Sequence, residues 1–121
     1  MFELMVEDSF SAAHQLKGYE GPCEKLHGHT FRVQVFLSGI STDKLGMVVD
    51  FKVAKKKLAD CIKELDHSNL NELKAFSTEN PTAENIAKFI YTKLKEEFTA
   101  AVGLSNVTVF ESPNASATYY E

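Results

Sequence analysis

The chain has 121 residues, enough for one domain with its own hydrophobic core, and its 44% hydrophobic and 25% charged residues are ordinary for a globular protein. Its net charge of -4 and its one arginine, Arg32, leave too little positive charge to neutralise a run of phosphates, which argues against nucleic acid as a partner. No apolar stretch is long enough to span a membrane, and the acidic residues of the first segment are unlike a signal peptide, so no membrane partner is expected.

The first elements expected along the chain are two strands. Residues 2–7 place apolar side chains on one face, and this strand continues irregularly to His14. A loop at residues 18–22 precedes a second strand at residues 27–38, which alternates more strongly. One face of that strand carries two histidines and four apolar residues: His27, His29, Phe31, Val33, Val35 and Leu37.

The middle of the chain changes to helical spacing. A helix over residues 51–64 is predicted by an apolar stripe with lysines opposite it, made of Ala54, Leu58, Cys61, Ile62 and Leu65. A second helix is predicted to begin near Asn80-Pro81-Thr82, where a capping side chain and an early proline favour initiation. Its apolar stripe runs from Ala83 to Phe98, and Gly103 ends the region.

Two further strands are predicted at residues 107–111 and 115–119, on either side of a turn at Pro113-Asn114. The expected order is therefore β-β-α-α-β-β, within one domain of residues 1–121. This order predicts an α+β fold in which two helices cover one face of a four-stranded antiparallel sheet. Open sheet edges and an uncovered sheet face predict a homo-oligomer.

Three of the four histidines are spaced as ligands of a metal ion. His27 and His29 project from the same face of one strand, because residues i and i+2 of a strand point the same way. His14 ends the preceding strand, which could pair with this one. Three imidazoles and a vacant fourth position are typical of a catalytic zinc site, although copper, nickel and iron also accept imidazole ligands.

The two cysteines have different expected roles. They are too few for a disulfide framework, so both thiols are expected to be free in a reducing cytoplasm. Cys61 lies on the apolar stripe of a helix and is predicted to be part of the core. Cys23 follows Gly21-Pro22 and precedes His27, and its position leaves three roles open: a buried thiol, a fourth zinc ligand or a reactive thiolate.

Two carboxylates complete the candidate set. Asp66 precedes His67. If Cys23 lay close by, the carboxylate could orient an imidazole that acts on the thiol; otherwise the pair belongs to a solvated loop. Glu111 ends a predicted strand on the same face as Val107 and Val109. It either turns to solvent or accepts two donors from an amidine-like ring edge at the floor of a pocket.

Taken together, these residues resemble the 6-pyruvoyl-tetrahydropterin synthase family. The pattern is His14, then Cys23-x-x-x-His27-Gly28-His29, then Asp66-His67, then Asn80-Pro81-Thr82-Ala83-Glu84-Asn85, then Glu111. It spans most of the chain. The three-residue gap between Cys23 and His27 is similar to the bacterial 6-carboxy-tetrahydropterin synthase branch of queuosine biosynthesis, whereas the animal pyruvoyl-forming branch has a longer gap.

The resemblance implies a role for each site residue. His14, His27 and His29 would bind zinc. Cys23 would be the catalytic base, and Asp66 and His67 would complete its proton relay. Glu111 would anchor the pterin ring, and Thr82 would lie near it. The implied architecture is the tunnelling fold, in which three subunits close a barrel, two rings stack into a hexamer, and active sites lie between subunits.

The resemblance also implies a reaction. The substrate would be 7,8-dihydroneopterin triphosphate, and zinc would act on its side-chain oxygens as a Lewis acid while Cys23 removes a proton from the carbon next to the ring. The carboxy-forming branch makes 6-carboxy-5,6,7,8-tetrahydropterin and releases acetaldehyde and triphosphate. The pyruvoyl-forming branch, which serves a tetrahydrobiopterin-type pathway, eliminates only the triphosphate.

Two other classes of protein share part of the pattern. Cupin-type metal oxygenases also begin their motif with His-x-His on a strand, but they need a glutamate a few residues later, and residues 31–37 contain none. Two long helices also conflict with the all-β cupin fold. A non-catalytic zinc module with Cys23 as the fourth ligand has no such conflict, and it would lose zinc in a Cys23→Ala variant.

Overall fold

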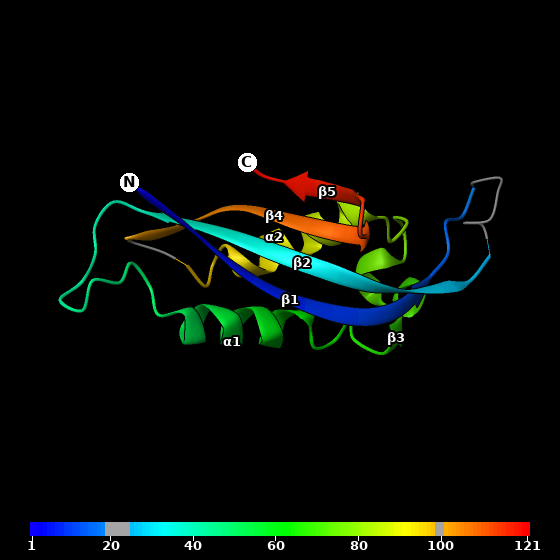
Figure 1. Cartoon of the computed structure of the whole chain (residues 1–121). Coiled ribbons are helices and arrows are strands. Elements are labelled where there is room, and N and C mark those ends of the chain that lie inside the picture. Colours follow the sequence, from blue (N-terminus) through cyan, green and yellow to red (C-terminus); the bar gives the residue numbers. More distant parts are fainter. Residues whose placement is uncertain (19–24, 99–100) are drawn as a thin grey trace.

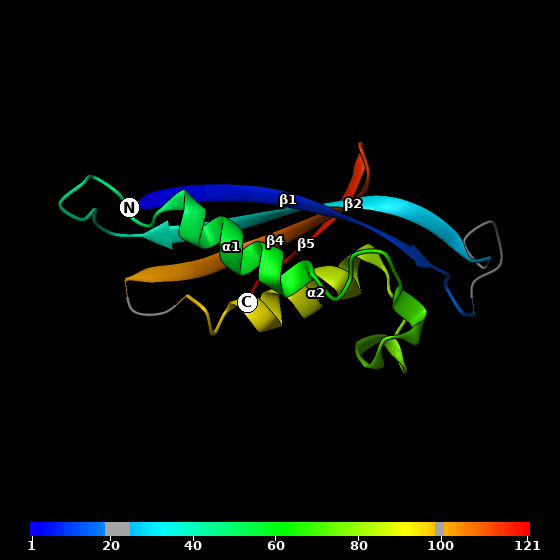
Figure 2. The same ribbon diagram turned by 90° about the horizontal axis from the view of Figure 1, so that it is seen from below.

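The computed structural model describes residues 1–18, 25–98 and 101–121. Its architecture is α+β: one twisted sheet carries two helices on the same face (Figures 1 and 2). The elements are β1 (Phe2–His14), β2 (His27–Gly39), α1 (Phe51–Ile62), β3 (Ser68–Asn69), the short 3-10 helices η2 (Leu70–Glu72) and η3 (Lys74–Phe76), α2 (Ala83–Leu94), β4 (Val102–Ser112) and β5 (Ala115–Tyr119).

The two longest strands, β1 and β2, form an antiparallel pair. Phe2 faces Gly39 at one end of the pair, and His14 faces His27 at the other. The predicted faces of β2 are confirmed, because its alternate apolar residues are all buried: Phe31, Val33, Val35 and Leu37. His29 shares their parity, so the histidines of β2 lie on the face that the helices cover.

The sheet continues from β2 through β4 to β5, and both of these pairings are antiparallel. The strand order is β3-β1-β2-β4-β5. Phe110 of β4 faces Arg32 of β2, so the next residue of β4, Glu111, lies toward the end of the sheet that carries the histidines.

The prediction of four antiparallel strands was wrong, because the sheet is five-stranded and mixed. The additional strand, β3, runs parallel to β1 and pairs Ala12 with Ser68 and Ala13 with Asn69. A two-residue strand is too short to produce a periodic sequence pattern, so nothing in residues 65–71 predicted it. The order β-β-α-α-β-β therefore becomes β-β-α-β-α-β-β.

Both helices begin at capped residues. Asp50 Oδ1 accepts the Lys52 N–H at 2.8 Å before α1, and Thr82 Oγ1 accepts the Asn85 N–H at 3.1 Å before α2. Their apolar stripes are buried against the sheet, with Ala54, Leu58, Cys61 and Ile62 from α1 and Ile86, Ala87, Ile90, Tyr91 and Leu94 from α2. In the described part of the chain, no helix has the length and apolar character needed to cross a membrane.

Cys61 belongs to this core, as predicted. Its side chain is 8% exposed, and burial raises the pKa of its thiol to about 11. The thiol is therefore protonated at neutral pH, which makes it a weak nucleophile and a poor metal ligand.

Candidate metal centre

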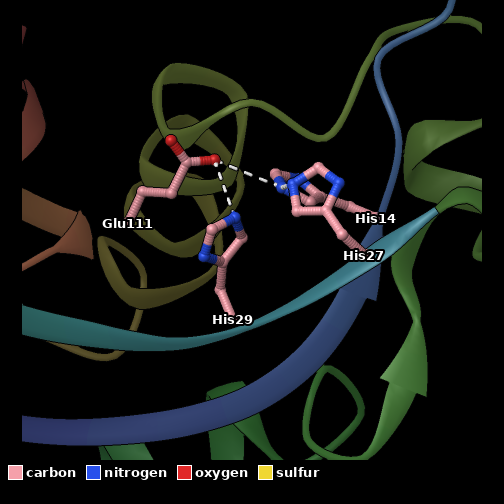
Figure 3. Close-up of side chains that lie close together, drawn as sticks. All are labelled: His14, His27, His29 and Glu111. Carbon is pink, nitrogen blue, oxygen red and sulfur yellow. Dashed lines mark hydrogen bonds and ion pairs between the residues drawn. The ribbon is translucent and has the colours of Figure 1, made fainter. Parts of the chain in front are cut away.

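Three histidines meet at the end of the β1–β2 pair. His14 faces His27 across the pair, and His29 follows two residues later on the same face of β2. The ring centroids lie 4.6 Å apart for His14 and His27, 5.1 Å for His14 and His29, and 4.7 Å for His27 and His29. Figure 3 shows the three rings converging, with His14 on β1 and the other two on β2.

Glu111 joins the histidines from the end of β4 (Figure 3). Its Oε1 lies 3.2 Å from Nε2 of His14 and 3.6 Å from Nε2 of His29. One ligand atom from each of the four residues lies within 4.8 Å of the other three. Three imidazole nitrogens and one carboxylate oxygen therefore surround a volume of the size that a single metal ion needs.

Hydrogen bonds to the backbone orient two of the rings. Nδ1 of His14 lies 2.7 Å from the carbonyl oxygen of Pro81, and Nδ1 of His27 lies 2.7 Å from that of Lys25. A carbonyl oxygen only accepts, so each Nδ1 carries a proton, and Nε2 is the nitrogen of each ring that could bind a metal ion at the centre. Such bonds to the outer nitrogen are typical of metal-binding histidines.

The four residues fit a cation, because their ligand atoms, which accept hydrogen bonds, face one another at the centre of the group. Nε2 of His14 lies 3.1 Å from Nε2 of His27. The Glu111 carboxylate also approaches Nε2 of His14. With both rings neutral, lone pairs would oppose one another, and one metal ion would satisfy them together. Among the described residues the donor atoms are nitrogen and oxygen, and such ligands suit zinc and also bind copper, nickel or iron.

The electrostatics of the site lower the pKa of His29. His14 is fully buried, at 0% exposure. Burial lowers the pKa of His29; Glu111 opposes this effect, while the neighbouring rings of His14 and His27 add to it. A metal ion competes with protons for the ring nitrogen, so a lowered pKa in His29 assists binding near neutral pH.

A cavity of about 670 Å³, lined by residues of β1, β2 and β4, adjoins the centre. His29 and Glu111 line it, together with Thr30, Arg32 and Phe110. The Arg32 guanidinium stacks over the Phe110 ring, 4.0 Å from the ring centroid. A small molecule in this cavity would therefore have access to two of the four residues of the centre.

Asp66 and His67 form an ion pair in the turn between α1 and β3. Asp66 Oδ2 lies 3.0 Å from Nδ1 of His67, and Asp66 Oδ1 accepts the backbone N–H of Ser11 at 2.9 Å. The Ser11 N–H is the main cause of a lowered pKa for Asp66, and the His67 side chain contributes further. The carboxylate is therefore ionised at neutral pH and fixes the orientation of the His67 ring.

The turn itself is anchored to β1 in an unusual backbone conformation. His67 has a φ of 56°, in the left-handed region, and its N–H donates to the carbonyl oxygen of Ser11 at 2.6 Å. The side chain of His67 is 84% exposed. Within the described ranges, neither Asp66 nor His67 makes a hydrogen bond or ion pair to the histidines or Glu111 of the metal centre.

Two sequence candidates remain, Cys23 and Thr82. Cys23 falls outside the described residues. Thr82 caps α2 with its hydroxyl, directly after Pro81, whose carbonyl oxygen orients His14. Sequence reasoning missed the part played by Pro81 and Lys25, because backbone carbonyls of any residue type can hold an imidazole and leave no signal in the sequence.

Comparison with known proteins assigns a family. Residues 3–121 match the family described as 6-pyruvoyl tetrahydropterin synthase. A curated relative, the 6-carboxy-5,6,7,8-tetrahydropterin synthase of Synechocystis sp., is 41% identical over 128 residues, which cover 99% of this chain and 94% of the relative. The dihydroneopterin monophosphate aldolase of Pyrococcus furiosus is also 41% identical, over 103 residues that cover 85% of this chain and 83% of the relative.

The fold is similar to that of solved members of the same family. The structure of the Caenorhabditis elegans 6-pyruvoyl tetrahydropterin synthase superposes with a TM-score of 0.88 at 32% sequence identity. The match covers 99% of this chain and 95% of the other. The arrangement of two helices on one five-stranded mixed sheet is therefore shared along nearly the whole length of both chains.

Proposed function

The chain belongs to the 6-pyruvoyl tetrahydropterin synthase family, and from this premise we propose that it converts 7,8-dihydroneopterin triphosphate into 6-carboxy-5,6,7,8-tetrahydropterin. The reaction releases acetaldehyde and triphosphate, and we place it in the cytoplasmic biosynthesis of queuosine. One observation carries the proposal: a group of three histidines and a glutamate beside a cavity, in a chain that a 6-carboxy-5,6,7,8-tetrahydropterin synthase matches over 99% of its length.

His14, His27 and His29 would hold a zinc ion. The hydrogen bonds to Nδ1 of His14 and His27 leave Nε2 of each ring free as a ligand atom. Bound there, zinc supplies Lewis-acid stabilisation of negative charge on the side-chain oxygens of the substrate. The lowered pKa of His29 keeps its ring in the neutral form that a metal requires.

Glu111 would anchor the pterin ring. Both of its contacts with the histidines use Oε1, and its side chain is 34% exposed at the wall of the cavity. An ionised carboxylate accepts two N–H groups in parallel, which matches the amino group and ring nitrogen of a pterin. Thr82 is proposed to lie near the ring on the family resemblance alone.

Cys23 would remove the proton from the side-chain carbon next to the ring. Asp66 and His67 would complete the relay that carries this proton. In support, ionised Asp66 accepts from Nδ1 of His67, which leaves Nε2 of the same ring available for proton exchange. In many enzymes a carboxylate orients an imidazole that acts on a nucleophile or base in this way.

We further propose a homo-oligomer, a trimer or a dimer of trimers with the tunnelling fold, whose active sites lie between subunits. Two observations support it. His67 is exposed and, among the described residues, makes no hydrogen bond or ion pair to the metal centre of its own chain. Among the described residues, β3 pairs with β1 only at Ala12 and Ala13, and Asp66 and His67 occupy the backbone of Ser11, so residues 2–10 of β1 offer an edge to a second copy.

Three alternatives remain to be separated by experiment. The pyruvoyl-forming reaction is favoured by the similarity to the C. elegans enzyme, and an aldolase reaction on a monophosphate by the relative from P. furiosus. The third alternative is a non-catalytic zinc module with Cys23 as the fourth ligand.

The test is to incubate zinc-loaded protein separately with dihydroneopterin triphosphate and dihydroneopterin monophosphate and to identify the products by mass. A carboxylated tetrahydropterin with acetaldehyde, formed from the triphosphate, is the expected result. A retained pyruvoyl side chain would assign the chain to the pyruvoyl-forming branch. Turnover of the monophosphate alone would assign it to the aldolases, and stable zinc binding without turnover would favour the zinc module.

A further inference from the structure

Two asparagine side chains take the place of a partner strand just beyond the metal ligand His14. Asn71 Oδ1 accepts the N–H of Gln15 at 2.8 Å, and Asn71 Nδ2 donates to the carbonyl oxygen of Gln15 at 3.0 Å. Asn80 does the same to Lys17, with Oδ1 and Nδ2 both at 2.9 Å from the backbone N and O. We call these two pairs of hydrogen bonds the asparagine clamps.

The clamps depend on the amide group. A side-chain amide offers both an acceptor and a donor, as a residue of a neighbouring strand does, whereas a carboxylate of the same shape only accepts. β1 ends at His14, and its partner β3 reaches only as far as Asn69. The clamps therefore extend the ordered backbone of β1 beyond the point at which the sheet stops.

Asn80 also connects its clamp to the metal centre. It directly precedes Pro81, whose carbonyl oxygen holds Nδ1 of His14. The carbonyl oxygen of Asn80 in turn accepts the N–H of Thr82 at 2.9 Å and Nδ2 of Asn85 at 2.8 Å. One short segment before α2 thus fixes both the ring of His14 and the backbone three residues after it.

We propose that Asn71 and Asn80 are positioning residues for the metal centre: their amides set the backbone of Gln15 and Lys17, and Asn80 with Pro81 sets the ring of His14. The role in turnover rests on the proposed function, because it acts through the zinc ion that would serve there as a Lewis acid. The role in zinc binding does not rest on it. Loss of either clamp is therefore expected to weaken zinc binding, and loss of the Asn80 clamp has the larger effect because Asn80 also carries Pro81.

The test compares Asn71→Leu, Asn80→Leu and the milder Asn80→Asp, which keeps the acceptor and loses the donor. Asp50→Ala, which removes the cap of α1, serves as a control for a general loss of stability. Each variant is assayed for zinc affinity by competition with a chelator, for hydrogen exchange at the N–H of Gln15 and Lys17, and for kcat and KM. Folding is checked by circular dichroism.

We expect Asn80→Leu to weaken zinc binding and to lower kcat, each by about 10- to 100-fold, the range found for groups that orient metal ligands. KM should stay unchanged in both leucine variants, and exchange at the clamped N–H should accelerate. Asn80→Asp should retain the protection of the Lys17 N–H and most of the zinc affinity. The Asp50→Ala control should lose thermal stability alone.

Two results would overturn the inference. One is faster exchange and lower stability in the asparagine variants with kcat and zinc affinity unchanged, as in the Asp50→Ala control, which would leave the clamps a purely structural role. The other is unchanged exchange at Gln15 and Lys17. Absence of product with the wild-type protein would count against the proposed function instead, and zinc affinity and exchange would then decide the inference.

Discussion

Nε2 of His14 lies 3.1 Å from Nε2 of His27, across the antiparallel pair of β1 and β2. The outer nitrogen of each ring is held by a backbone carbonyl oxygen, so neither ring is free to turn away from the other. The metal centre is therefore built on paired strands rather than on a loop, and it is oriented before an ion arrives. Sites held in this way lose little free energy to rearrangement on binding.

His27→Ala removes one of these two nitrogens and should abolish stoichiometric zinc binding, since a catalytic zinc site needs three protein ligands. Metal analysis of purified protein measures the zinc content, and zinc should no longer raise the Tm of the variant. Gln34→Ala, on the opposite face of the same strand, is the matched control and should bind zinc normally. A full zinc content in His27→Ala would remove this residue from the ligand set.

Glu111→Gln tests whether the carboxylate holds the substrate or the metal. As the pterin anchor, the carboxylate forms hydrogen bonds to the ring that the amide cannot reproduce, so KM should rise on the order of 10- to 100-fold with the zinc content unchanged. Steady-state kinetics and metal analysis of one preparation give both answers. Loss of zinc with an unchanged KM would show that Glu111 is a fourth ligand.

Cys61 should resist alkylation in the native protein. Its pKa of about 11 leaves roughly 100-fold less thiolate near pH 8 than the unperturbed value of 9.0 would give, and its burial also blocks access. Peptide mass mapping after treatment with iodoacetamide measures the modification, with urea-unfolded protein as the control for full reaction. Modification of native Cys61 at the rate of the unfolded control would contradict the burial of this thiol in the core.

Asp66→Asn should lower kcat without changing KM. The neutral amide no longer holds an imidazolium at His67, and general acid–base groups typically contribute about 10²- to 10⁴-fold in rate. The kinetics should be measured at saturating zinc, so that any effect on the metal is excluded. If kcat stays within a factor of two of the wild type, Asp66 has no part in the relay.

Asp66 also predicts a dependence of stability on pH. Its pKa is lowered in the folded chain, so its contribution is fully present above the unfolded value of 3.8 and disappears as the pH falls through the folded value. The difference in Tm between the wild type and Asp66→Asn should be largest near neutral pH and should shrink below pH 3.8. A difference in Tm that does not change with pH would mean that the carboxylate charge plays no part.

The strands that build the metal centre could be predicted because their patterns are long. β2 alternates over thirteen residues, which placed His27 and His29 on the core face, and the apolar stripe of α1 placed Cys61 in the core. The additional strand β3 could not be predicted, because it consists of only two residues, Ser68 and Asn69, which pair with β1 through their backbone.

Contacts made through side-chain hydrogen bonds between distant segments were also invisible in the sequence. Asn71 and Asn80 reach Gln15 and Lys17 across more than fifty residues of chain, and no local periodicity reports such a contact. Glu111 could be placed on the correct face of β4, but its approach to His14 depends on the register between three strands. Register is set by the whole sheet and cannot be read from one segment.

The most direct measurement is the yield of acetaldehyde when zinc is titrated into metal-free protein in the presence of excess dihydroneopterin triphosphate. The account predicts that the initial rate of acetaldehyde release rises with added zinc and saturates at about one ion per chain, and that His27→Ala shows no such rise. Release of acetaldehyde at the same rate before and after zinc addition, or saturation of the zinc site without any acetaldehyde, would contradict it.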